Sequence, residues 1–106
     1  MNGAINHHAG LSAEDRVAAE YSRQGLTIAA RRWRGPGGEV DLIFRQGAAL
    51  VFVEGKKSRD LASAAARITH RQMDRIMSSA AAFLAGEPGG QDTEVRFDVA
   101  LVDGMG

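Results

Sequence analysis

The 106-residue sequence contains no cysteine, which excludes disulfide scaffolds, cysteine-ligated zinc fingers and thiol nucleophiles. It has only two prolines, one tryptophan and one tyrosine. No apolar run approaches the roughly 20 residues of a membrane span. The polar stretch Met1 to Gly10 lacks the basic start and apolar core of a signal peptide. We therefore expect a cytoplasmic protein that has no membrane partner.

The chain also lacks a net charge, although its charges are unevenly distributed. The stretch Arg31 to Arg75 holds ten basic and five acidic residues and so carries +5. A basic middle on a neutral chain is suited to binding a polyanion, whereas charge alone favours an ordinary solvated surface. Apolar residues make up 44% and charged residues 25% of the chain, as in a soluble globular protein of one domain.

The pattern of apolar residues predicts a mixed α/β domain over residues 11–106, preceded by a mobile tail over residues 1–10. A first helix is expected over Leu11–Gln24, with Ser12 as its N-cap, and a second helix is expected to end before Gly86. The predicted strands are Leu26–Trp33, Glu39–Arg45, Leu50–Lys56 and Glu94–Val102. The order is helix, three strands, helix, strand, with the helices packed on a central sheet.

The two middle strands are predicted to form a hairpin around Gly47-Ala48, a pair suited to a type II′ turn. In that register Asp41 lies opposite Glu54, and Glu39 lies opposite Lys56, all on one face. The other face is predicted to be the core face and carries Val40, Leu42, Phe44, Val51, Val53 and Gly55. Opposed carboxylates destabilise a sheet unless a positive group lies between them. That group is either Lys56 or a divalent cation such as Mg²⁺ or Mn²⁺, and the register leaves both readings open.

The segments Glu39–Ile43 and Leu50–Lys56 resemble the motif of the PD-(D/E)xK nuclease superfamily. Within it, the chain is most similar to the YraN-like family of small uncharacterised proteins, which are predicted nucleases related in fold to Holliday-junction resolvases. Further matches in order are Ala13-Glu14, Ala18, Tyr21, Arg34, Thr69, Arg71-Gln72, Ile76 and Arg96-Phe97-Asp98-Val99. The resemblance implies a restriction-endonuclease-like fold. It also implies metal-dependent hydrolysis of phosphodiester bonds in DNA or RNA, branched substrates included.

The resemblance also implies a role for each matching residue. The implied Mg²⁺ or Mn²⁺ ligands are Asp41, Glu54, Glu14 and the backbone carbonyl of Gly55. Lys56 would activate the attacking water and stabilise charge on the phosphate, and Gln72 would lie beside the site. Two of these residues also have a purely structural interpretation. An acid such as Glu14 is favoured at a helix start by the helix dipole, and Gln72 forms a capping box with Thr69.

Basic side chains around this motif are the candidates for contacts with nucleic acid: Arg31, Arg32, Arg34, Lys57, Arg67, Arg71 and Arg75. Arg67, Arg71 and Arg75 are spaced by four and so share one face of the second helix. Pairing with nearby acids is the alternative reading of that face.

Two features depart from the family pattern. Gly55 stands where relatives carry a β-branched or large apolar residue, so the strand either stays regular or bulges there. The chain also stops soon after Val102, where relatives continue with a short apolar segment. Two other functions therefore stand beside the nuclease: a nucleic-acid-binding module without catalysis, and a small oligomerising or adaptor domain. A two-fold dimer would grip a duplex better than a monomer, and the sequence itself holds no proof of one.

Overall fold

The structure is a computed structural model that describes residues 12–57 and 70–102. Its elements are α2 (Ala13–Arg23), β1 (Thr27–Gly35), β2 (Gly38–Gln46), β3 (Ala49–Lys57), α4 (His70–Leu84), the 3-10 turn η1 (Gly90–Asp92) and β4 (Val95–Val102). The predicted element order is confirmed, and η1 is an addition to it. The predicted tail over residues 1–10, together with Arg67 and Thr69, lies outside the described residues.

Local chemistry explains where α2 begins and ends. The Ser12 hydroxyl accepts a hydrogen bond from the Asp15 backbone N–H at 3.1 Å, which satisfies one of the free donors at the helix start. After Gln24 the chain passes through Gly25 at φ +93°, a conformation that glycine adopts without strain. The predicted N-cap at Ser12 is thus confirmed.

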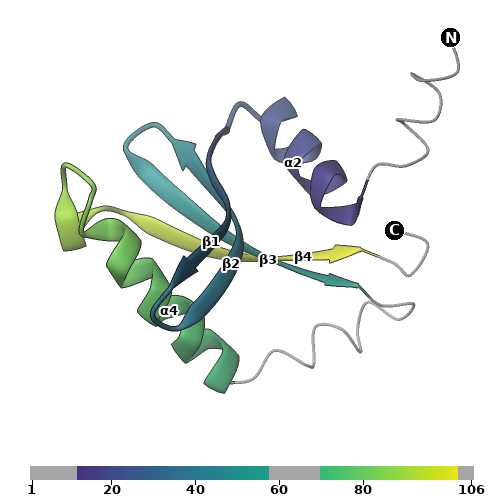
Figure 1. Ribbon diagram of the computed structural model, residues 1–106. Helices are drawn as coiled ribbons and strands as arrows, with labels where there is room; N and C mark the ends of the chain where they lie inside the picture. The colour runs from purple at the N-terminus through teal and green to yellow at the C-terminus, as the bar shows by residue number, and fades with distance from the viewer. Residues whose placement is uncertain (1–11, 58–69, 103–106) are drawn as a thin grey trace, which may run out of the picture.

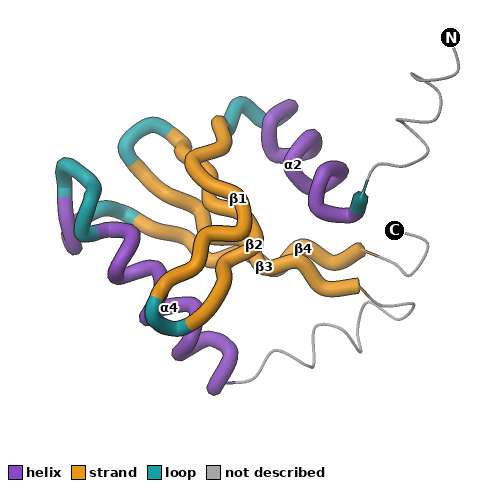
Figure 2. Tube along the Cα trace, in the orientation of Figure 1, coloured by secondary structure: helices purple, strands orange, loops and turns teal. Residues whose placement is uncertain are grey.

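The four strands form one mixed sheet in the order β1-β2-β3-β4. The first three are antiparallel neighbours, and β4 pairs in parallel with β3 after a crossover that contains α4. Figure 1 shows α2 and α4 on opposite sides of this sheet. In Figure 2 the β1–β2 turn reaches α4, while the far ends of β3 and β4 run together to the other side of the molecule.

Both faces of the sheet are buried, which differs from the single core face expected of the hairpin. Under α2 the core contains Leu42, Phe44, Val51 and Val53 together with Ala18 and Leu26. Under α4 a second core contains Val40, Ile43, Leu50 and Phe52 together with Ala80 and Leu84. Each helix therefore covers its own apolar layer.

The placement of Val40 corrects the predicted face assignment. Val40 was expected beside Leu42 and Phe44, yet it packs in the α4 core with Ile43. The pairing of β1 with β2 runs Arg31–Leu42 and then Trp33–Val40, and it omits Arg32 and Asp41. Arg32 has φ +49°, which is uncommon outside glycine. The backbone irregularity at this point shifts the alternation of side chains in β2 and turns Val40 to the other face.

Candidate functional site

The ladder between β2 and β3 ends where the predicted site begins. The expected register is confirmed from Gln46–Ala49 to Leu42–Val53, around a turn in which Gly47 has φ +63°. The next two predicted pairs, Asp41–Glu54 and Glu39–Lys56, are wrong: neither pair is formed between these strands. Glu39 instead pairs with Arg34 of β1. Beyond the last pair, a side chain of β2 can accept a hydrogen bond that the β2 backbone would otherwise accept from β3.

The side chain of Asp41 is this acceptor. Its Oδ2 atom accepts a hydrogen bond from the backbone N–H of Gly55 at 2.8 Å. In a continued ladder, this N–H would point at the backbone of β2. The N–H and C=O of one residue in a strand point the same way, so the Gly55 carbonyl is directed toward the same gap between β2 and β3. Asp41 and the backbone of Gly55 thus meet at one place although they are far apart in the sequence.

Glu54 directly precedes Gly55 and is half-buried. It lines a small cavity of about 40 Å³ together with Phe52, Met73, Ile76, Phe97, Asp98 and Val99. Its Oε1 atom is shielded from solvent. A space of this size is enough for about one water molecule, whose share of liquid volume is roughly 30 Å³. The carboxylate therefore lies at the edge of a mostly apolar pocket between the sheet and α4.

The Glu54-Gly55-Lys56 segment is a regular strand. β3 stays paired with β4 without a register shift from Leu50–Val95 to Lys57–Val102, and Gly55 does not have a positive φ. Of the two conformations expected at Gly55, the structure has the regular one. Lys56 follows in the same ladder, opposite Leu101, while the side chains of Lys56 and Lys57 lie outside the described part of the structure.

Gln72 lies in the first turn of α4 and is half-buried, next to Met73 of the small cavity. Its proposed capping partner Thr69 is not among the described residues. The structure therefore places Gln72 on the helix that covers Glu54.

Glu14 is held by two arginines of β1. Arg31 Nη1 and Arg32 Nε each lie 3.2 Å from a Glu14 carboxylate oxygen, and Arg31 also binds Asp15 at 3.0 Å. The hydrogen bond that Arg32 donates to the Glu14 carboxylate raises the pKa of Arg32. The pKa of Asp15 is lowered, first by its bond to Ser12 and then by Arg31. Within residues 12–57 and 70–102, no three His, Asp or Glu side chains gather as a group that could hold a metal ion.

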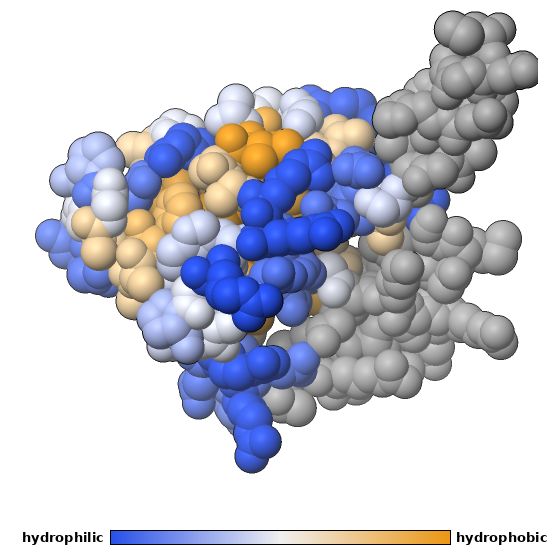
Figure 3. Space-filling model, in the orientation of Figure 1, coloured by the Kyte–Doolittle hydropathy of each residue, from blue (hydrophilic) through white to orange (hydrophobic). Residues whose placement is uncertain are grey.

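The predicted nucleic-acid contacts that the structure describes lie on β1 and α4. Arg31, Arg32 and Arg34 are exposed along β1, and Arg71 and Arg75 are exposed on α4. Arg34 lies 3.8 Å from Glu39, which is a long and exposed pairing. Gly37 in the turn after β1 packs directly against the Arg75 backbone, which brings the two basic segments together. Figure 3 shows strongly hydrophilic side chains gathered on this side of the molecule.

Comparison with known proteins shows which family the chain resembles. The model of the uncharacterised protein family UPF0102 matches residues 13–102 of this chain. The chain belongs to the UPF0102 family. A UPF0102 protein of Cereibacter sphaeroides strain KD131 is 58% identical over 106 residues, covering 100% of this chain and 91% of the relative. One from Ruegeria pomeroyi is 56% identical over 104 residues, covering 98% of this chain and 85% of the relative.

A UPF0102 protein from Dinoroseobacter shibae is more distant, at 45% identity over 97 residues, with 92% of this chain and 72% of the relative covered. The predicted YraN-like family membership is thereby confirmed as membership of UPF0102. The names of these relatives state no activity.

One polar contact of this UPF0102 chain was not predicted from the sequence, in which Tyr21 is only one of the residues that match the family pattern. Its ring stacks on Phe44 with centroids 4.6 Å apart, and its hydroxyl donates to Asp98 Oδ2 at 2.7 Å. Burial and, secondarily, the Asp98 carboxylate raise the pKa of Tyr21 to about 12. The available signal was the polar pair Arg96 and Asp98, which interrupts an otherwise apolar strand.

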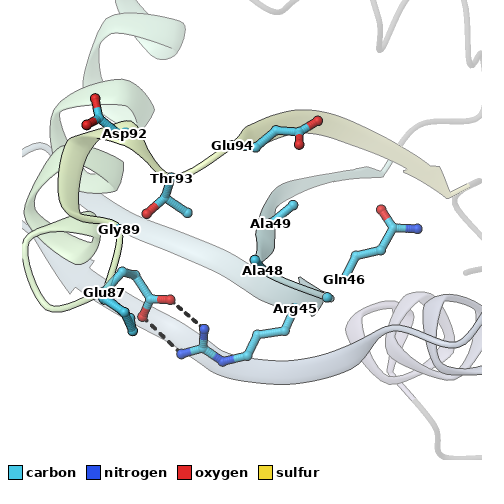
Figure 4. Close-up of a pocket in the computed structure, with 11 residues that line it drawn as sticks. Arg45, Gln46, Ala48, Ala49, Glu87, Gly89, Asp92, Thr93 and Glu94 are labelled. Atoms are coloured by element: carbon cyan, nitrogen blue, oxygen red, sulfur yellow. Dashed lines mark hydrogen bonds and ion pairs between the residues drawn. The ribbon is translucent and has the colours of Figure 1, made fainter.

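A larger cavity of about 500 Å³ lies at the opposite end of the sheet, between the β2–β3 turn and the chain after α4. Figure 4 shows the Arg45 guanidinium and the Glu87 carboxylate meeting at its rim through two bonds of 2.5 and 3.0 Å. The bond from Arg45 lowers the pKa of Glu87. No motif in the sequence indicated this cavity, because its walls come from two distant turns. Asp41 and Glu54 do not line it.

Proposed function

We propose that this UPF0102 chain is a metal-dependent nuclease that hydrolyses phosphodiester bonds of DNA or RNA, with a restriction-endonuclease-like fold of the PD-(D/E)xK superfamily. The observation that carries the proposal is the hydrogen bond from the Gly55 N–H to Asp41. It brings a carboxylate of β2 to the Glu54-Gly55-Lys56 segment of β3, at the point where the two strands stop pairing. The combination of two acids and a lysine is suited to phosphoryl chemistry at a metal ion.

The donor set fits a hard divalent cation. Asp41 and Glu54 offer carboxylate oxygens, and the Gly55 carbonyl adds a neutral oxygen that points toward Asp41. Mg²⁺ is usually bound through one or two carboxylates and keeps several waters, so a third carboxylate is not required. Mg²⁺ or Mn²⁺ held by Asp41, Glu54 and Gly55 would lower the pKa of a bound water molecule. Its positive charge would also stabilise the negative charge on the phosphate.

The other residues of the proposal act around this set. Lys56 places a compact positive charge two residues after Glu54, where it would orient the attacking water and stabilise charge on the phosphate. Gln72 would help position that water from the first turn of α4. The arginines of β1 and α4 would bind the backbone of the nucleic acid on the outer surface.

Glu14 has a different place in the proposal. Because Arg31 and Arg32 hold its carboxylate, Glu14 would serve as a ligand only after these bonds are released. We therefore assign its main role to holding β1 against α2, and a metal role remains a prediction.

The test is a cleavage assay with Mn²⁺ on branched, flapped and single-stranded substrates. Asp41→Asn keeps an oxygen acceptor for the Gly55 N–H but removes the charge, so the fold should persist while cleavage falls by at least about 100-fold. Glu54→Gln and Lys56→Ala should show comparable losses. Glu39→Gln, an exposed neutralisation on the same strand, is the matched control and should cleave like the wild type. Cleavage that survives both Asp41→Asn and Lys56→Ala would contradict the proposal.

Metal binding can be measured without turnover. Mn²⁺ or Mg²⁺ should raise the melting temperature of the wild type by mass action, and Asp41→Asn should abolish this rise. Equal responses in the two proteins would remove Asp41 from the site.

The second candidate is a nucleic-acid-binding module that has lost catalysis. The observation that favours it is Glu14, whose carboxylate is engaged by two arginines. This candidate predicts binding of nucleic acid with no cleavage by the wild type. A third candidate, the small adaptor domain, predicts neither. A cytoplasmic location remains a prediction, and no helix among the described residues has the length and apolar character to cross a bilayer.

A further inference from the structure

β4 forms one edge of the sheet, and among the described residues no strand pairs with its outer side. Its eight residues pair with β3 without a register shift. The opposite edge, β1, is interrupted by a register shift between Ile28 and Ala30 and by the left-handed Arg32. Bulges and charges of this kind protect an edge from pairing with another chain. Of the two edges, β4 is therefore the one built to accept a further strand.

The backbone groups that β4 offers follow from one hydrogen bond. The Glu94 carbonyl accepts from the Leu50 N–H at 2.9 Å, so the backbone groups of Glu94 point toward β3. Direction alternates along a strand, and so the groups of Val95, Phe97 and Val99 point outward. An antiparallel strand would pair with these three residues, with Phe97 at the centre.

The side chains beside Phe97 carry opposite charges. Arg96 Nε lies 2.9 Å from Asp98 Oδ1, and both residues are on the face of α2. If two copies of β4 pair antiparallel about a two-fold axis at Phe97, Arg96 comes opposite Asp98 of the partner subunit. Val95 then comes opposite Val99 of the partner subunit. Directly opposed pairs that do not exchange hydrogen bonds bring their side chains closest, which is the position of these charges.

A two-fold axis at either neighbouring outward-facing residue does not place Asp98 opposite an arginine of the partner subunit. A centre at Val99 places Asp98 opposite Ala100 of the partner subunit. A centre at Val95 places Asp98 opposite Asp92 of the partner subunit. Among centres at the outward-facing residues Val95, Phe97 and Val99, only Phe97 makes the strand complementary to itself in both charge and hydrophobicity.

Exposed apolar side chains on β4 and α4 support the same conclusion. Val99 is 40% exposed and Met77 is 52% exposed, and they are two of the three large hydrophobic side chains that stand exposed in the described structure. Met73, one turn before Met77 on α4, lines the small cavity together with Val99. A strand added to β4 would cover Val99 and extend the apolar layer under α4.

We infer that β4 pairs antiparallel with β4 of a second copy of this chain, centred on Phe97, in a two-fold dimer with one continuous sheet. The partner is a second copy because the sequence Val95-Arg96-Phe97-Asp98-Val99 complements its own reverse. Each Asp98 then lies between the guanidinium of its own chain and that of the partner. The inference does not depend on the proposed nuclease activity.

The first experiment is sedimentation equilibrium of the full chain at about 10 to 500 µM, a range that resolves micromolar association. The wild type should form a dimer. Arg96→Glu replaces two attractive pairs across the axis with two repulsive ones and should weaken the dimer by at least about tenfold. Arg23→Glu reverses an exposed charge on α2 and is the matched control, which should leave the dimer unchanged. A wild type that stays monomeric, or Arg96→Glu that dimerises as the wild type does, would overturn the inference.

The second experiment tests the register itself. Asp98→Lys also sets like charges against each other in its own dimer. Mixed with Arg96→Glu, it restores both opposite-charge pairs, so the mixture should form a heterodimer more tightly than either variant alone forms a homodimer. Failure of the mixture to dimerise, with both variants folded by circular dichroism, would reject the register centred on Phe97. If Asp98→Lys does not fold because Tyr21 loses its acceptor, the result for Arg96→Glu decides.

Discussion

At the scale of single residues, Tyr21 joins α2 to the last strand of the sheet. It is the only tyrosine in the chain, so its ionisation can be followed directly by ultraviolet absorbance. Its ring lies on Phe44 of β2, and its hydroxyl reaches Asp98 of β4. One side chain of α2 therefore contacts two strands, and its protonation reports whether the three elements are assembled.

The raised pKa of Tyr21 gives a prediction with a definite sign. Its pKa is about 12 in the folded protein and 10.0 when unperturbed. Between these values the unfolded chain loses the phenolic proton while the folded protein keeps it. The stabilisation is fully present below pH 10 and should be lost as pH rises toward 12. Absorbance titration should place the folded midpoint near 12, and Tyr21→Phe should remove this component of the pH dependence. A folded midpoint near 10 would contradict the prediction.

Gly55 supports a second residue-scale prediction. A Cβ atom at this position would lie 3.5 Å from Asp41 Oδ2, an ordinary van der Waals distance, and its φ is not positive. Gly55→Ala should therefore stabilise the protein by about 0.5–1 kcal/mol, because alanine loses less conformational freedom on folding. Urea denaturation measures the change. Gly25→Ala is the contrasting variant and should destabilise the protein, since Gly25 has φ +93°. A destabilised Gly55→Ala would mean that the strand needs glycine there.

At the scale of elements, α4 packs closely against the β1–β2 turn, with the backbones of the helix and the turn in near contact. The Ser79 hydroxyl accepts from the Gly37 N–H at 3.1 Å and donates to the Gly38 carbonyl at 2.8 Å, and Ser79 is buried. A Cβ on Gly37 would lie 2.1 Å from the Arg75 carbonyl oxygen, far inside contact distance. The turn and the helix fit together only because this position has no side chain.

Gly37→Ala should therefore destabilise the protein by about 1–3 kcal/mol, the usual range for overpacking. Gly86→Ala is the matched control. Its Cβ would meet no atom closer than 3.7 Å, and it follows the end of α4. Thermal unfolding of both variants makes the comparison. Equal melting temperatures for Gly37→Ala and the wild type would show that α4 can shift away without cost.

Local patterns predicted most of the elements, and tertiary contacts explain the misses. Alternation of apolar residues and the Gly47-Ala48 turn predicted β2, β3 and five of their pairs, because these depend on neighbours in the sequence. The shifted face of Val40 depends on Arg32 of another strand. The need for glycine at position 37 depends on α4, which is distant from this turn in the sequence. The motif predicted that Asp41 and Glu54 lie near each other, whereas the bond to the Gly55 N–H depends on where the ladder ends.

At the scale of the whole molecule, charge is separated although the total is zero. The basic residues of β1 and α4 lie around the packed turn, whereas Glu87, Asp92 and Glu94 line the cavity at the other end of the sheet. An approaching polyanion would be steered to the basic end and away from the acidic one.

Binding to nucleic acid should accordingly be steeply salt dependent. Arg71→Ala with Arg75→Ala should weaken binding for all sequences and reduce the slope of log K against log salt by about 1.8 for duplex DNA. Fluorescence anisotropy across a salt series measures both effects. Arg16→Ala, an exposed cation on α2, is the control. If the wild type does not bind even at low salt, both the nuclease and the binding-module proposals fail.

The parallel pairing of β4 with β3 sets the order in which the sheet can be built. β1, β2 and β3 are joined by tight turns, whereas β4 reaches β3 only after the crossover through α4, and such distant pairings form slowly. On the ribosome, the edge of β3 must wait for β4, which is synthesised after β3 and α4. Phe44→Leu in β2 should therefore slow refolding, and Phe97→Leu in β4 should mainly speed unfolding. Stopped-flow kinetics separates the two rates, and a β4 variant that slows refolding as much as the β2 variant would reverse this order.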